Sequence, residues 1–217
     1  MNTSNLQSLR CWLGAISLLT VLAGCSVIGP KKEERAGASV RALNYTAREI
    51  YMIGVEEPGN PKNDGGGDAL NPYSGGGSIC CFGIPSQWHP DLKVIVEYQF
   101  YPEKEVRRAL VNVPPYPDGK PGDIWLIVHE DESPEAVVSK YGPSRPEWPG
   151  KIKGYPVPSR EYRLKLWGEK LQREKSSKAG FERALQRTDI TPEQRAGYID
   201  AIDYHNRVII RLEENKP

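Results

Sequence analysis

The segment Lys93-Val94-Ile95-Val96-Glu97-Tyr98-Gln99-Phe100-Tyr101 carries the clearest structural signal in the chain, because its residues alternate. Valine, valine, tyrosine and phenylalanine occupy every second position, and mostly polar residues stand between them. Successive side chains of a β-strand point to opposite faces, so this period of two predicts a strand with one buried face. We expect the core of the domain to contain Val94, Val96, Tyr98 and Phe100.

Further strands are predicted on both sides of this segment. The ranges 50–55 and 78–84 precede it, and the ranges 106–113 and 124–129 follow it. Glycine and proline punctuate the intervals between them, as is typical of turns. Several short strands joined in this way predict a mainly antiparallel, sandwich-like β-rich domain over residues 40–158.

A long glycine-rich tract runs from Pro58 to Gly77 and contains two Gly-Gly-Gly runs. Loops of this length are uncommon in compact domains and are usually functional or disordered, so we expect one of these here. Four oxygen-bearing side chains in the tract raise the question of a calcium site, although their spacing departs from that of an EF-hand. Ordinary turn chemistry is the preferred interpretation for these four, Asn60, Asp64, Asp68 and Asn71.

The pattern becomes helical in the C-terminal region, residues 159–217. Thr191-Pro192-Glu193-Gln194 has the residues of a capping box, and apolar residues then recur at helical spacing. This predicts a helix over about 192–213, the second arm of a helical hairpin. The first arm is expected within 160–187, after an extended start. The fold class is therefore predicted as α+β, with a mainly antiparallel β domain followed by a C-terminal helical hairpin.

The N-terminal region resembles a bacterial lipoprotein signal. Leu22-Ala23-Gly24-Cys25 closes an apolar stretch that begins near Cys11, and this stretch is too short to span a membrane. We expect residues 1–24 to be a signal peptide, Cys25 to be the lipidated residue and residues 25–39 to form a tether. An ordinary cleaved signal peptide is the alternative.

The residue after the expected lipidation site points to a location. Ser26 resembles the signal that directs bacterial lipoproteins to the outer membrane. We therefore expect a lipid-anchored protein of the outer membrane that faces the periplasm. A diacylglycerol group together with an amide-linked acyl chain would make this anchor stable.

Charge is balanced overall but unevenly distributed. Residues 25–217 contain 28 basic and 28 acidic side chains, which gives no argument for nucleic-acid binding. Residues 25–150 contain 13 basic and 18 acidic side chains, whereas residues 151–217 contain 15 and 10. Two interpretations are open for the C-terminal excess. It is either a solvated helical surface or a basic helical face that meets an acidic partner or lipid head groups.

Cys80 and Cys81 are the only cysteines after the expected lipidation site. Three interpretations are open: two small buried side chains, a disulfide between neighbours, or an intermolecular bond. A metal site is not expected, because two cysteines without further ligands at suitable spacing do not make a zinc site.

The sequence contains few residues that suggest catalysis. His129 precedes Glu130-Asp131-Glu132 and could act as a base beside a carboxylate, but a histidine at a sheet edge before an acidic turn is preferred. The motifs of α/β-hydrolases, zinc proteases and P-loop proteins are absent from the sequence. We predict no enzyme, no catalytic residue, no metal and no cofactor. Either packing or interface contacts are expected of Trp88, Trp125, Trp148 and Trp167.

The order of several motifs resembles a family of proteobacterial lipoproteins catalogued as a domain of unknown function. The resemblance covers about 40–167 and rests on Asn44-Tyr45-Thr46, Gly75-Gly76-Gly77-Ser78-Ile79-Cys80-Cys81 and, further on, Trp88, Leu126-Ile127-Val128-His129, Tyr141-Gly142-Pro143 and Trp148-Pro149-Gly150.

Members of this family are often encoded beside type VI secretion phospholipase effectors and are assigned as their immunity proteins. The resemblance therefore implies an immunity protein that binds a phospholipase effector at the membrane. The glycine-rich tract and the basic helical arm are the surfaces expected to make this contact. The alternative is a structural or assembly lipoprotein, an adaptor or pilot of an envelope complex.

Overall fold

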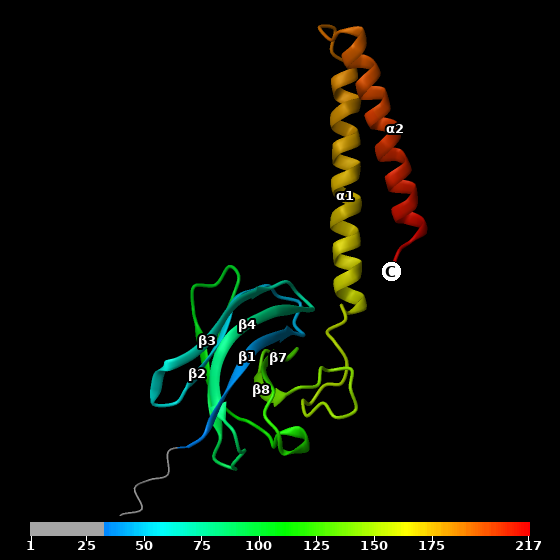
Figure 1. Cartoon of the computed structure of the whole chain (residues 1–217). Helices are drawn as coiled ribbons and strands as arrows, with labels where there is room; N and C mark the ends of the chain where they lie inside the picture. The colour runs from blue at the N-terminus through cyan, green and yellow to red at the C-terminus, as the bar shows by residue number, and fades with distance from the viewer. Residues whose placement is uncertain (1–32) are drawn as a thin grey trace, which may run out of the picture. The chain divides into compact units, whose positions relative to one another are not determined.

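The strand predicted at the centre of the sequence is β5 (Lys93–Phe100), which lies inside a four-stranded antiparallel sheet (Figure 1). We call this sheet B; its order is β3 (Asn60–Leu70), β2 (Ile50–Glu57), β5 and β6 (Arg107–Asn112). The computed structural model describes residues 33–217. The expected signal peptide 1–24 and the expected lipidation site Cys25 lie outside the described residues.

A second four-stranded sheet, sheet A, packs against the first. Its order is β4 (Ser74–Pro85), β1 (Arg35–Asn44), β7 (Asp123–Val128) and β8 (Pro134–Ser139). All its pairs are antiparallel except β1 with β7, which run parallel. The predicted sandwich-like α+β class is thus confirmed, with one parallel pair.

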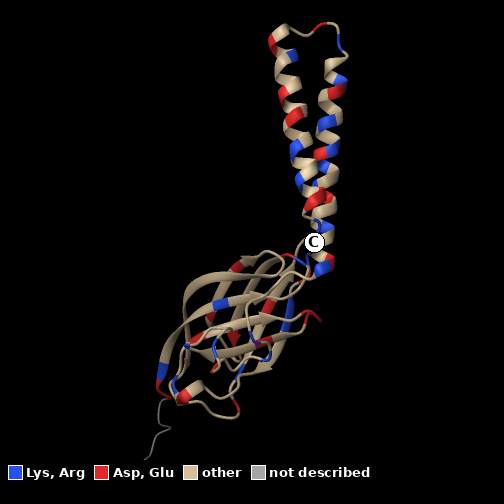
Figure 2. Cartoon of the chain, turned by 90° about the vertical axis from the view of Figure 1, so that its right-hand side faces the viewer, with Lys and Arg blue, Asp and Glu red and all other residues tan. Residues whose placement is uncertain are grey.

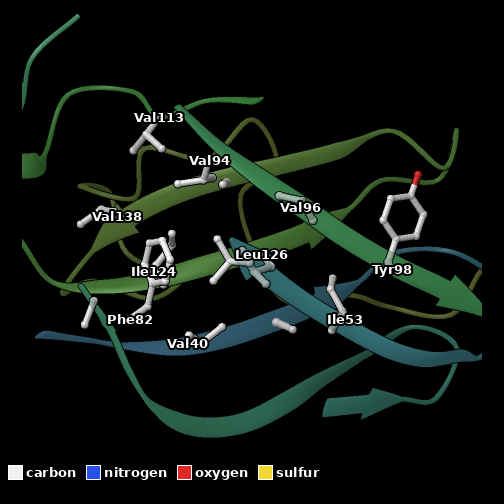
Figure 3. Packing of buried hydrophobic residues seen from close by; sticks show 14 of the residues in the cluster. Val40, Ile53, Phe82, Val94, Val96, Tyr98, Val113, Ile124, Leu126 and Val138 are labelled. Carbon is white, nitrogen blue, oxygen red and sulfur yellow. The ribbon is translucent and has the colours of Figure 1, made fainter. Parts of the chain in front are cut away.

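The main core lies between the two sheets (Figure 3). The four core residues predicted on β5 are at most 5% exposed, and they pack with Ile124 and Leu126 of β7, which are fully buried. The residues between them on β5 are half-buried or exposed, as the alternation requires. Both clusters of buried apolar residues lie within residues 34–217, which form one compact unit.

The glycine-rich tract forms strands, and the prediction of a long loop from Pro58 to Gly77 is wrong. Its residues build β3 and the first part of β4. Gly66 has a φ of +102°, and a Cβ there would lie 2.8 Å from the Ile53 carbonyl oxygen. Glycine therefore lets β3 approach β2 closely, which explains a composition that otherwise indicates a loop.

Side chains of β3 join the two sheets along one edge. Asn63 accepts a hydrogen bond from the Gly83 N–H at 2.7 Å and donates one to the Gly83 carbonyl oxygen at 2.8 Å. Asp68 Oδ2 accepts from the Gly77 N–H at 2.7 Å. The sandwich is therefore closed by polar contacts between β3 and β4, while β6 and β8 form the opposite edges.

Three elements differ from the sequence predictions. β1 begins at Arg35, inside the segment expected to be a tether, and β8 was not predicted at all. Helix α1 (Arg160–Leu185) is helical from its first residue, so the expected extended start is wrong. Ser159 caps this helix by accepting a hydrogen bond from the Tyr162 N–H.

The helical hairpin is confirmed. Helix α2 (Pro192–Glu214) begins with the predicted capping box, in which the Thr191 and Gln194 side chains bond each other's backbone N–H. The two helices contact each other through Trp167, whose Nε1 donates to the Leu212 carbonyl oxygen at 2.7 Å, and through Glu174, 2.7 Å from His205 Nδ1. No helix among the described residues is long and apolar enough to cross a membrane.

Candidate protein-binding surface

The outer face of sheet A is covered by the segment 140–158, which we call the strap. Side chains on this face form a second buried cluster with Trp148 of the strap: Leu43, Tyr45, Trp125, Ile127 and Val137. The Trp125 and Trp148 rings meet edge to face at 5.3 Å, and Tyr45 donates to the Gly154 carbonyl oxygen at 2.7 Å. Burial, together with the nearby charge of Glu135, raises the pKa of Tyr45 to about 12.

The histidine singled out in the sequence belongs to this covered face. His129 Nε2 lies 2.7 Å from Glu135 Oε2, and both residues are 8% exposed. Its partner is therefore a residue of β8 and none of the acidic residues 130–132. Glu135 also accepts from the Lys151 N–H of the strap at 3.2 Å. This buried pair holds the strap on the sheet.

The outer face of sheet B, in contrast, is open. It carries four large exposed apolar side chains, and we call this surface the open face: Tyr51 (61% exposed), Tyr101 (60%), Val106 (43%) and Leu110 (58%). Tyr101 follows buried Phe100, and Tyr51 follows buried Ile50 at a point where the register of β2 against β5 shifts, so both tyrosines lie outside the core. Apolar side chains gathered on one face mark protein interaction sites.

An ion-pair cluster stands in the middle of the open face. Arg108 of β6 pairs with Glu56 at 3.0 Å and also with Glu97. Leu110 lies opposite Ile95 in the same sheet and borders a groove at the β6 edge. The residues that line this groove are Leu110, Val111, Asn112, Pro114, Pro134, Glu135, Pro149 and Lys151. Tyrosine and arginine surrounded by aliphatic side chains are the composition of binding hot spots.

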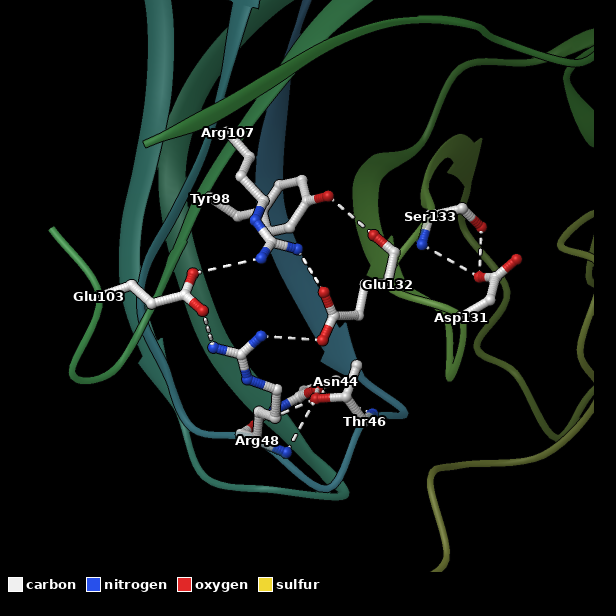
Figure 4. A network of polar contacts seen from close by, with 9 residues as sticks. All are labelled: Asn44, Thr46, Arg48, Tyr98, Glu103, Arg107, Asp131, Glu132 and Ser133. Carbon is white, nitrogen blue, oxygen red and sulfur yellow. Dashed lines mark hydrogen bonds and ion pairs between the residues drawn. The ribbon is translucent and has the colours of Figure 1, made fainter. Parts of the chain in front are cut away.

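A ring of four charged residues supports the loops beside the open face (Figure 4). Arg48 pairs with Glu103, and with Glu132 at 2.9 Å; Arg107 pairs with Glu132, and with Glu103 at 3.2 Å. Both guanidinium groups lie over the ring of buried Phe100, with their Cζ atoms 4.1 and 4.9 Å from its centroid. The ring ties together the β1–β2, β5–β6 and β7–β8 loops, and so holds Tyr101 and Val106 in place.

The motif Asn44-Tyr45-Thr46 shapes the first of these loops. Asn44 is fully buried; its Oδ1 accepts from the Thr46 N–H at 2.9 Å, and its Nδ2 donates to the Arg48 and Asn71 carbonyl oxygens. Thr46 Oγ1 accepts from the Arg48 N–H at 3.0 Å. These bonds orient Arg48 toward the ring. The sequence contains this motif but gives no sign of Asn71 as its partner, because Asn71 lies 27 residues away in the turn between β3 and β4.

The ring predicts an acid-sensitive stability. Hydrogen bonds from Arg107 and Arg48 lower the pKa of Glu132, and Arg48 lowers that of Glu103. A carboxyl whose pKa is lower in the folded state contributes stability above its unfolded pKa, about 4.3, and this stability is lost as pH falls through the folded pKa. We expect the free energy of unfolding to decline below that pH, and to decline less in Glu132→Gln.

Urea unfolding of the two proteins from neutral to acidic pH checks this expectation. Glu105→Gln is the control, because Glu105 is an exposed carboxylate of the β5–β6 loop outside the ring, and it should leave the pH dependence unchanged. Parallel pH profiles for wild type and Glu132→Gln would contradict the role of the ring.

The cysteines of the glycine-rich motif are joined to each other. Cys80 and Cys81 form a disulfide, and both residues are exposed on β4. Because both residues are exposed, the interpretation as two small buried side chains is wrong.

The other candidates from the sequence contribute to packing and turns. Asp68 binds the backbone of β4, and the described residues contain no group of three or more His, Cys, Asp or Glu side chains placed to hold a metal ion. Trp125 and Trp148 are buried, while Trp88 donates to the Val113 carbonyl oxygen and Trp167 joins the helices. None of these four tryptophans lies on the open face.

Comparison with known families adds one finding. Residues 43–133 match the model of a family described as a protein of unknown function (DUF3304). The match includes β2 to β7, the open face and the charged ring, and it ends before the strap and the helical hairpin. No curated protein and no solved structure matches the chain.

Proposed function

We propose that this protein is a membrane-anchored periplasmic lipoprotein of the outer membrane that binds and inhibits a type VI secretion phospholipase toxin. The observation that carries the binding role is the open face of sheet B, which combines exposed tyrosine and aliphatic side chains with the ion pairs of Arg108. The anchor rests on the lipobox-like Leu22-Ala23-Gly24-Cys25, and the kind of partner rests on the family resemblance.

Inhibition of this kind requires a tight interface and no chemistry on the part of the inhibitor. The open face lies on a rigid sheet, and the charged ring fixes the loops beside it. Preorganisation lowers the entropy lost on binding, so such a surface supports high affinity. Anchoring on the membrane that the toxin attacks also raises the effective concentration of the inhibitor.

The glycine-rich tract is no longer the expected contact surface. Its residues are paired within β3 and β4, and the polar contacts of Asn63 and Asp68 occupy this edge. We therefore assign the toxin contact to the open face.

Co-expression tests this proposal. A phospholipase gene adjacent to the gene for this protein would be directed to the periplasm, with and without the protein. We expect wild type to rescue growth and to co-purify with the toxin. Cys25→Ala with a cleavable signal peptide separates placement from binding, because a soluble form that still rescues shows that the anchor only positions the inhibitor.

The alternative is a structural or assembly lipoprotein, and the observation that favours it is the hairpin of two long helices outside the family match. Absence of both rescue and complex formation with adjacent effectors would support this adaptor role. Co-purification of an envelope complex from the native host would then identify the partner.

A further inference from the structure

The heptad pattern of the hairpin sorts its residues onto different sides. Contact residues recur at alternating spacings of three and four and occupy the a and d positions of a two-helix seam. On α1 they are Leu164, Trp167, Leu171, Glu174, Lys178, Phe181 and Leu185. On α2 they are Tyr198, Ile202, His205, Ile209 and Leu212. The contacts of Trp167 with Leu212 and of Glu174 with His205 agree with this assignment.

The e and g positions of the heptad, which flank the a and d positions, lie on two different sides of the seam. Because the helices are antiparallel, the e positions of both helices share one side and the g positions share the other. Lys175 and Glu213, both at e positions, form an ion pair at 3.0 Å, as this geometry requires. The g positions Arg163 and Lys170 therefore lie on the opposite side.

The cations of this second side gather in the half of the hairpin where α1 begins and α2 ends. No aspartate or glutamate stands at any g or c position of α1 or α2. We call it the basic side; it consists of Arg163, Leu166, Lys170 and Arg173 of α1 with Tyr204, Val208 and Arg211 of α2. Its four cationic residues are exposed, and none forms an ion pair within residues 33–217. Figure 2 shows the charged residues along both helices.

We propose that the basic side of the hairpin binds the anionic surface of a phospholipid membrane. Arginine and lysine pair with headgroup phosphates, and arginine does so with two parallel hydrogen bonds. Leu166 is 44% exposed and Tyr204 is 56% exposed, and they provide the aliphatic and aromatic contacts of an interfacial helix. This inference rests on the proposed membrane anchor, which would bring the hairpin within reach of lipid.

The composition favours lipid over an acidic protein. The cations come from both helices at one end of the hairpin and are interleaved with apolar residues, which suits an anionic surface with an apolar layer beneath it. The opposite side of α1 carries charges of both signs, because its e positions include Glu161 and Glu182 as well as Lys175. Only the basic side therefore has the uniform sign that a membrane surface selects.

Vesicle binding by residues 34–217 tests this proposal, because this compact unit contains both buried clusters and lacks the expected lipid. Vesicles of phosphatidylcholine alone would be compared with vesicles that contain about 30% phosphatidylglycerol. We expect binding only to the anionic vesicles, with affinity that falls as salt is added. The triple variant Arg163→Gln/Lys170→Gln/Arg173→Gln should bind at least about tenfold more weakly.

A matched control distinguishes the effect of where the cations lie from the effect of the net charge of the protein. Lys165→Gln/Arg183→Gln/Arg207→Gln removes three exposed cations from other sides of the hairpin and should change affinity by less than about twofold. Circular dichroism confirms that both variants keep their helices. Absence of binding to anionic vesicles, or equal losses in the two triple variants, would overturn the proposal.

The results of the vesicle experiment can be distinguished from those of the toxin experiment. If the unit does not bind vesicles but the basic-side variant loses rescue of growth, an acidic protein partner replaces the membrane as the occupant. Vesicle binding without rescue would leave the basic side intact and remove the toxin-binding function instead.

Discussion

Replacing Phe100 by alanine is expected to lower the free energy of unfolding by about 3–5 kcal/mol. The side chain is fully buried in β5, where it meets Tyr98 edge to face at 5.6 Å. Its removal leaves a cavity and also takes away the aromatic surface under Arg48 and Arg107. A domain of ordinary stability, about 5–15 kcal/mol, would lose a large fraction of it.

Urea unfolding at neutral pH measures this loss. The adjacent residue offers the matched control, since Tyr101 is 60% exposed and points away from the core. Tyr101→Ala should change stability by no more than about 0.5 kcal/mol. Similar losses for the two variants would show that Phe100 is not part of the core.

Loss of toxin binding is the second large effect expected. Tyr51→Ala/Tyr101→Ala with Leu110→Glu removes two aromatic anchors and places a carboxylate at the β6 edge of the proposed interface. Hot-spot residues each contribute about 2 kcal/mol or more, so affinity for the toxin should fall by at least about a thousandfold. The measurement is calorimetric titration with the purified effector, followed by the rescue assay.

A control variant and a stability measurement test whether the loss of binding is specific to the open face. Val157→Glu introduces the same charge at a residue that is 74% exposed and lies outside the open face, and it should retain binding. The open-face variant should unfold at the same urea concentration as wild type, because its three side chains lie outside the core. Full rescue by this variant would remove the open face as the toxin-binding surface.

The two sheets show why exposed and buried faces have different roles here. Strand β7 is apolar on both sides, and the strap packs on its outer residues Trp125 and Ile127. Strand β5 has one apolar side, and its outer residues Glu97 and Gln99 leave sheet B uncovered. Such a face combines polar residues with exposed tyrosine side chains, which are the residue type that anchors many protein interfaces.

Local patterns in the sequence were sufficient for several elements. The alternation along 93–100 predicted β5 and its four core residues, because the two faces of a strand depend only on position along the chain. The capping box at Thr191 predicted the start of α2, since its hydrogen bonds join residues three apart. The sandwich-like α+β class followed from the succession of such elements.

The tertiary structure alone decided the rest, because the contacts involved join residues far apart in sequence. Gly66 lies in a strand only because β2 is beside it, and no local pattern distinguishes that arrangement from a loop. His129 meets Glu135 across a turn and is then covered by the strap. The open face and the charged ring arise in the same way, since burial and ion pairing depend on which strands come together and not on the residues of any one strand.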